Sequence, residues 1–122
     1  DCTGKVGAVG YCLGGMLAYL VGARTKADAS VGFYGVGIQD ALGEAANISG
    51  PHMMHIAELD QFVPPEAQTA IKDGLGSNAK VTIHSYANVD HAFARTGGEH
   101  FDAASATQAN TRTAEFFAQH LA

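Results

Sequence analysis

Residues 6–16 constrain the fold of this chain more strongly than any other stretch. They begin as an apolar run, pass through a Gly-x-Cys-x-Gly pattern centred on Cys12, and continue into helix-forming residues. This order predicts a buried strand, a sharp turn that carries Cys12, and the start of a helix. A side chain at the tip of such a turn needs strained backbone, so we expect its neighbours two positions away to lack a Cβ atom. Gly10 and Gly14 meet that need, and Gly15 lets the helix pack close to the sheet.

A nucleophile between two glycines, at the point where a strand turns into a helix, resembles the nucleophile elbow of α/β-hydrolases. Here cysteine stands where serine is usual. The turn would place the Cys12 sulfur at the positive end of a helix, where a thiolate is favoured. The backbone N–H of Leu13 would contribute to an oxyanion hole. The alternative is a glycine-rich strand–loop–helix with a buried structural cysteine.

Composition narrows the classes of partner. The 122 residues carry a formal net charge of −5, and the seven Lys and Arg residues are scattered, which argues against nucleic acid or a membrane surface as partner. The apolar stretch at residues 13–23 is too short to span a bilayer. No signal peptide is visible at the N-terminus, and two cysteines do not make a disulfide framework, so we expect a cytoplasmic location with a free thiol.

Apolar runs alternate with helical patterns along the chain. They predict strands at residues 5–10, 30–34, 52–57 and 80–86, and helices at residues 14–25, 40–46, 64–74 and 103–121. In the first helix the residues at core spacing are Met16, Leu17, Leu20 and Val21. This alternation indicates an α/β fold, with a mainly parallel sheet of about four strands and helices on both faces. We expect residues 1–122 to form a single domain.

The first expected strand lies at an edge of this sheet. In α/β-hydrolases the elbow follows a strand in the middle of the sheet, so the chain resembles the C-terminal half of that fold. The strand from Lys5 to Gly10 would then leave an apolar edge that natural proteins rarely expose. We expect a homodimer, a larger assembly or an N-terminal half of the fold to cover this edge.

A cysteine nucleophile needs a base, and the base needs a carboxylate to orient it. In α/β-hydrolases the chain order is nucleophile, acid, histidine. Asp60 follows the strand at residues 52–57, with Glu58 as a competing acid, and His91 follows the strand at residues 80–86. The carboxyl ends of parallel strands meet at one edge, so a Cys12–His91–Asp60 triad is predicted. The alternatives are that Asp60 only shapes a turn and that His91 is a surface residue.

Several segments resemble the dienelactone hydrolase (carboxymethylenebutenolidase) family, over essentially the whole chain and matching the C-terminal half of that enzyme. The matching segments are Gly10-Tyr11-Cys12-Leu13-Gly14-Gly15, Phe33-Tyr34-Gly35-Val36-Gly37, Asp60-Gln61-Phe62-Val63-Pro64, His91-Ala92-Phe93-Ala94-Arg95 and Ala109-Asn110-Thr111-Arg112-Thr113. The resemblance implies a cytoplasmic hydrolase that opens a small-molecule lactone or ester, without metal or cofactor, in bacterial breakdown of chlorinated aromatics.

The resemblance also assigns roles to single residues. Cys12, Asp60 and His91 match the nucleophile, the acid and the base, and Arg95 matches an arginine that binds the substrate carboxylate. Phe33 lies in a substrate-binding segment where family members often carry tyrosine.

The chain departs from the family pattern at two further positions. Asp90 and Ala92 flank His91 where glycine and serine are common, which leaves the preferred substrate open. The family's other functional groups, a glutamate that helps activate the thiol, a second substrate arginine and a second oxyanion amide, lie in the N-terminal half. The alternative function is therefore a catalytically silent half-fold that acts as an assembly or binding module.

Overall fold

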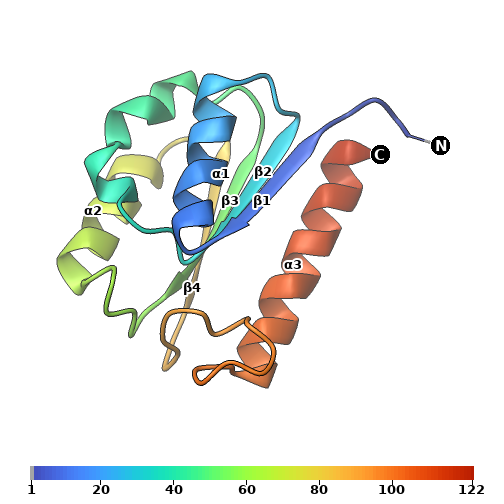
Figure 1. The fold of residues 1–122 in the computed structure, drawn as a ribbon. Coiled ribbons are helices and arrows are strands. Elements are labelled where there is room, and N and C mark those ends of the chain that lie inside the picture. Colours follow the sequence, from blue (N-terminus) through green and yellow to red (C-terminus); the bar gives the residue numbers. More distant parts are fainter. Residues whose placement is uncertain (1) are drawn as a thin grey trace.

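The expected strands form one parallel sheet in the computed structural model, which describes residues 2–122. Their order in the sheet is the order in the chain, β1 (Gly7–Tyr11), β2 (Ala29–Phe33), β3 (His52–Ala57) and β4 (Val81–Tyr86). Helices α1 (Leu13–Arg24) and α2 (Pro65–Leu75) cover one face, and α3 (Ala103–Leu121) covers the other (Figure 1). The predicted three-layer α/β architecture is confirmed.

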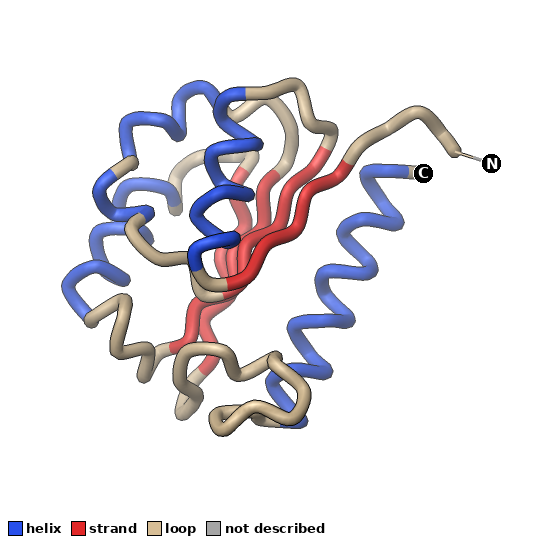
Figure 2. Tube along the Cα trace, in the orientation of Figure 1, coloured by secondary structure: helices blue, strands red, loops and turns tan. Residues whose placement is uncertain are grey.

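Each face of the sheet has its own apolar core. All residues of β2 and β3 are buried, which is why these strands read as continuous apolar runs rather than alternating ones. Figure 2 shows the strands between the two helix layers. One core contains Tyr19 of α1 and Ile71 of α2, and the other contains Phe33 of β2 and Phe116 of α3. The sheet therefore lies between two separately packed apolar cores, one on each face.

The prediction of a helix at residues 40–46 is wrong. The chain forms two 3₁₀ turns instead, Ile38–Asp40 and Leu42–Asn47, which are interrupted at Ala41 with φ −129° and ψ 27°. The segment is too short to nucleate an α-helix readily, and Gly43 weakens it further. The hydroxyl of Tyr19 also donates a hydrogen bond of 2.8 Å to Ala41 O, which ties the break to α1.

Strand β1 lies at the edge of the sheet and exposes apolar side chains. Val9 is 49% exposed and Leu17 of α1 is 53% exposed, although the helical pattern predicts Leu17 in the core. The other large apolar side chains exposed on this side of the fold are Val6, Tyr11 and Leu13. The expectation for Leu17 is wrong because β1 has no further strand beside it on which α1 could pack.

Two buried histidines point to opposite faces of β3, as their spacing predicts. On the α1 side, His52 Nδ1 lies 2.7 Å from Ser30 Oγ. On the α3 side, His55 Nδ1 lies 2.8 Å from Tyr86 Oη, and Nε2 lies 2.9 Å from Thr113 Oγ1. Burial lowers the pKa of His52 to about 4. Burial, assisted by His84 and Arg112, lowers the pKa of His55 to about 3.

Acid is expected to destabilise the fold through these two histidines. Above pH 6.5 they are neutral in both states, but below it the unfolded chain takes up protons that the folded chain excludes until about pH 4 and pH 3. Stability therefore falls as the pH decreases, by about 2 kcal/mol for each histidine at pH 5. Urea unfolding at pH 7 and pH 5 measures this loss. Equal unfolding free energies at the two pH values would contradict the prediction.

Candidate active site

Cys12 occupies a strained turn between β1 and α1. Its φ of 59° and ψ of −121° lie in a backbone region that residues other than glycine rarely adopt. The amide of Cys12 donates to Phe33 O at 3.1 Å, and its carbonyl accepts from Gly15 N at 2.9 Å. These bonds fix the turn to β2 and to the first turn of α1, so the side chain projects above the carboxyl end of the sheet.

The glycines around Cys12 meet different needs. A Cβ atom at Gly10 would lie 1.9 Å from Gly14 O, so glycine is required there. A Cβ atom at Gly14 would meet nothing within 4 Å, so the expectation that this position must also lack a side chain is wrong. At Gly15 a Cβ atom would lie 2.7 Å from Gly35 Cα, which confirms that this glycine allows α1 to approach the sheet closely.

Leu13 is the first residue of α1. At this position a backbone N–H has no acceptor within the helix, so it is available to a bound group. The side chain is 65% exposed and takes no part in the turn. The use of the Leu13 amide as an oxyanion donor stays a prediction.

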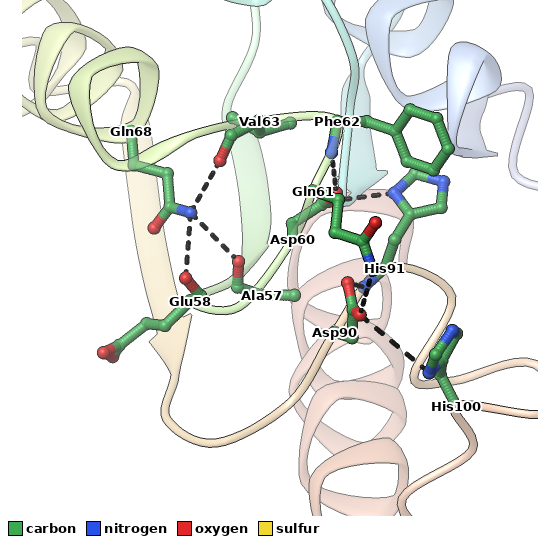
Figure 3. A network of polar contacts seen from close by, with 10 residues as sticks. All are labelled: Ala57, Glu58, Asp60, Gln61, Phe62, Val63, Gln68, Asp90, His91 and His100. Carbon is green, nitrogen blue, oxygen red and sulfur yellow. Dashed lines mark hydrogen bonds and ion pairs between the residues drawn. The ribbon is translucent and has the colours of Figure 1, made fainter.

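Asp60 and His91 meet at the carboxyl ends of β3 and β4. Asp60 Oδ2 lies 2.8 Å from His91 Nδ1, and the two side chains are 1% and 14% exposed (Figure 3). Asp60 Oδ1 accepts the Phe62 amide at 2.8 Å. Since an ionised carboxylate can only accept, Nδ1–H of His91 donates this hydrogen bond, which leaves Nε2 of His91 for other chemistry.

Aromatic rings fix the orientation of this imidazole. The ring of Tyr34 lies 5.0 Å from the His91 ring, and Phe62 lies 4.8 Å from it in a T-shaped arrangement. Together with the hydrogen bond to Asp60, these contacts limit rotation of His91 before any ligand binds.

An open cavity of about 410 Å³ joins the expected residues. It is lined by Tyr11, Cys12, Tyr34, His91, Ala92, Ala94, Arg95 and Asn110. Among them, Cys12, Tyr34 and Ala92 have positive φ values of 59°, 39° and 66°. Strained backbone of this kind gathers at functional sites, where the surrounding structure holds it in place.

The structure brings Cys12, His91 and Arg95 to this cavity, with Asp60 behind His91. It does not bring Phe33 there. The Phe33 side chain is 0% exposed and packs in the core beneath the site. The reason is that Phe33 is the last residue of β2 and points into the α3 layer, whereas the next residue, Tyr34, turns out toward the cavity.

Sequence reasoning also missed two residues. Asn110 of α3 lines the cavity beside Arg95. Gln68 of α2 is buried, and its Nε2 lies 3.2, 3.2 and 2.8 Å from the carbonyl oxygens of Ala57, Glu58 and Val63 (Figure 3). Gln68 thus anchors the loop that carries Asp60, and only the tertiary packing of α2 reveals this.

The surroundings of Cys12 raise the pKa of its thiol. Burial is the main cause, the Asp60 carboxylate adds to it, and Arg95 opposes both. The expectation that the helix terminus favours a thiolate is therefore not met.

Within residues 2–122, no hydrogen bond joins Cys12 Sγ to His91, and no group of three or more His, Cys, Asp or Glu side chains could hold a metal ion. No described helix has both the length and the apolar character that crossing a membrane requires.

Solved structures define the class to which this fold belongs. A provisionally named dienelactone hydrolase of Klebsiella pneumoniae superimposes with a TM-score of 0.83 at 24% identity, over 93% of this chain and 51% of that one. An esterase of Pyrococcus furiosus superimposes with a TM-score of 0.75 at 14% identity, over 97% of this chain and 54% of that one. The described fold thus matches about half of an α/β-hydrolase fold.

The family within this class follows from the sequence. The model of the dienelactone hydrolase family matches residues 1–121, and the chain belongs to that family. A provisionally named carboxymethylenebutenolidase of Azospirillum brasilense is 53% identical over 109 residues, 89% of this chain and 47% of that protein. Carboxymethylenebutenolidase of Pseudomonas putida is 42% identical over 116 residues, 95% of this chain and 49% of that protein. The chain spans about half the length of these relatives.

Proposed function

We propose that this site hydrolyses the lactone ring of dienelactone-type substrates, with Cys12 as nucleophile, His91 as base and Asp60 as the group that orients His91. The observation that carries the proposal is the buried 2.8 Å contact between Asp60 and His91, behind the cavity that Cys12 also lines. Membership of the dienelactone hydrolase family supports this substrate class.

The reaction begins with transfer of the Cys12 thiol proton to His91 Nε2. The sulfur attacks the lactone carbonyl, and the Leu13 amide stabilises the oxyanion that forms. Collapse of this intermediate expels the ring oxygen as an enolate, which takes the proton from His91, and leaves a thioester on Cys12. His91 then accepts a proton from water, the hydroxide attacks the thioester, and the thiol leaves with the proton returned to it.

Arg95 supplies the positive charge for the substrate carboxylate. Its side chain is exposed at the cavity, and within residues 2–122 no carboxylate forms an ion pair with it. A planar guanidinium can hold a carboxylate through two hydrogen bonds. Asn110 also lines the cavity and offers an amide to the same group.

Arg95→Gln tests the proposed function. A charge-assisted hydrogen bond contributes about 1.5–3 kcal/mol, so we expect kcat/KM for a dienelactone carboxylate to fall about tenfold to 100-fold, mainly through KM. Hydrolysis of p-nitrophenyl acetate, which has no carboxylate, serves as the matched control and should be unchanged. Absence of dienelactone turnover by the folded wild-type chain would contradict the proposed function.

A second candidate function rests on the exposed edge of the sheet. Val9 of β1 and Leu17 of α1 form part of an apolar surface at which the strand has unpaired backbone groups. Such an edge favours pairing with another strand. In this case the chain is a binding or assembly module, and a second copy of the chain is the simplest partner.

The mass of the folded chain in solution tests this second candidate. We expect light scattering at micromolar concentration to give a multiple of the 12.6 kDa chain mass. Val9→Lys, which places a charge on the exposed edge, should shift the equilibrium toward a single chain. A folded wild-type chain with the mass of one copy would exclude self-assembly through this edge.

A further inference from the structure

Asp90 belongs to the loop that carries His91 and contacts the loop that carries Asp60. It follows β4 directly before His91, and its Oδ1 accepts the His91 amide hydrogen bond. Its Oδ2 accepts from Gln61 Nε2 at 3.3 Å and lies 3.9 Å from His100 Nδ1 (Figure 3). One carboxylate thus contacts the backbone of the His91 loop and the residue that follows Asp60.

Other contacts hold each loop but do not replace this link. Gln68 fixes the Asp60 loop to α2, on the side away from His91. A backbone hydrogen bond of 2.9 Å from Leu59 to Val89 joins the loops near the strand ends. Beyond that point they are joined by the Asp60–His91 pair itself, by the contact between Phe62 and the imidazole, and by Asp90.

The charge of Asp90 is maintained by its surroundings. Burial disfavours it, but the hydrogen bonds from His91 and Gln61, together with His100, hold the pKa of Asp90 below its usual value. Asp90 does not line the cavity of Cys12, so it does not meet a bound substrate. Any effect it has on the reaction must pass through the His91 and Asp60 loops, which it joins.

We propose that Asp90 is a positioning residue that ties the His91 loop to the Asp60 loop and holds the imidazole in register with Cys12. This inference rests on the proposed function, and it adds a residue outside the proposed triad. The role is geometric, because hydrogen bonds rather than a direct contact with the reacting atoms link Asp90 to the site.

Two substitutions separate geometry from charge. Asp90→Ala removes all the contacts, and misplacement of a reacting group by about 1 Å can cost about 100-fold, so we expect kcat to fall about tenfold to 100-fold with little change in KM. Asp90→Asn keeps an oxygen for the His91 amide, and its NH2 group can donate to Gln61 Oε1 once the exposed Gln61 amide turns over, so it should recover most of the loss. Gln61→Ala, an exposed position, should lower kcat less than Asp90→Ala does, without a change in KM.

A measurement that needs no turnover keeps this test separate from the proposed function. The proton NMR signal of His91 Nδ1–H, shared with Asp60, should be present in the wild-type chain and in Asp90→Asn, and broadened or lost in Asp90→Ala. Glu99→Gln is the matched control, because Glu99 is a neighbouring exposed carboxylate and should affect neither kcat nor the signal.

The outcomes are distinct. An Asp90→Ala variant with an unchanged signal and unchanged kcat overturns the proposal, as does an Asp90→Asn variant as impaired as Asp90→Ala. If Asp90→Ala does not fold, an unaltered kcat and signal in Gln61→Ala overturns it. A wild-type chain without lactone turnover refutes the proposed function, while the NMR comparison still decides the role of Asp90.

Discussion

Cys12→Ala is expected to reduce dienelactone hydrolysis by about four to six orders of magnitude, the range seen when a nucleophile that acts as one unit with its base is removed. His91 and Asp60 would persist, but no thioester could form. The loss should appear in kcat, because the cavity and Arg95 are unchanged. Alanine also tolerates the positive φ of this position about as well as cysteine does, so thermal unfolding should be little affected.

Cys2→Ala is the matched control for this experiment. Both cysteines are free, but Cys2 is exposed and lies outside the cavity, so its removal should leave turnover intact. Mass spectrometry after rapid quenching should detect an acyl group on the chain that contains Cys12 and none on Cys12→Ala. Turnover of Cys12→Ala at the wild-type rate would exclude this mechanism.

Gly10→Ala is expected to destabilise the fold by more than about 3 kcal/mol, beyond the usual cost of overpacking. The new Cβ atom would lie 1.9 Å from Gly14 O and 3.0 Å from Gly14 Cα, and both are backbone atoms that cannot rotate away. Relief requires β1 and α1 to separate at the turn, which would disturb the hydrogen bonds that hold Cys12.

The second elbow glycine provides the control. Gly14→Ala places its Cβ atom in open space within α1, where alanine is favoured over glycine by about 1 kcal/mol. Urea unfolding of the two variants should therefore change in opposite directions. Similar losses in both would show that the pattern is symmetric, contrary to the geometry of the turn.

Much of the fold could be predicted because its strands and long helices carry local signals. The bounds of β3 and α3 agree with the sequence-based ranges, since a buried apolar run and a long amphipathic pattern each mark their own ends. The 3₁₀ turns after β2 could not be predicted in this way. Their form depends on the contact from Tyr19 to Ala41, which lies 22 residues away in the sequence.

The candidate site also combines features that could be predicted from the sequence with features that could not. The order of Cys12, Asp60 and His91 along the chain indicated that they would lie at the same edge of the sheet, because parallel strands bring their carboxyl ends together. Sequence reasoning selected Phe33 instead of Tyr34, since a single residue at a strand end decides which side chain points to the core. The raised pKa of Cys12 results from burial and from Asp60, which are properties of the folded chain alone.

The hydrogen bonds around His55 determine where α3 sits along the sheet. Thr113 donates to Ala109 O at 2.9 Å, so its oxygen accepts from His55 Nε2, while Tyr86 donates to His55 Nδ1 and accepts from Arg112 at 3.1 Å. In this series of hydrogen bonds, each hydroxyl and each ring N–H therefore has one acceptor to which it donates. A helix held by apolar contacts alone could slip by a turn of about 5.4 Å, whereas here a slip would leave buried polar groups unpaired.

The position of α3 along the sheet also decides which of its residues reaches the cavity, because Asn110 lies one helical turn before Thr113 on the same helix. The place of Asn110 at the cavity is therefore set in part from inside the sheet, by a buried imidazole that does not itself line the cavity.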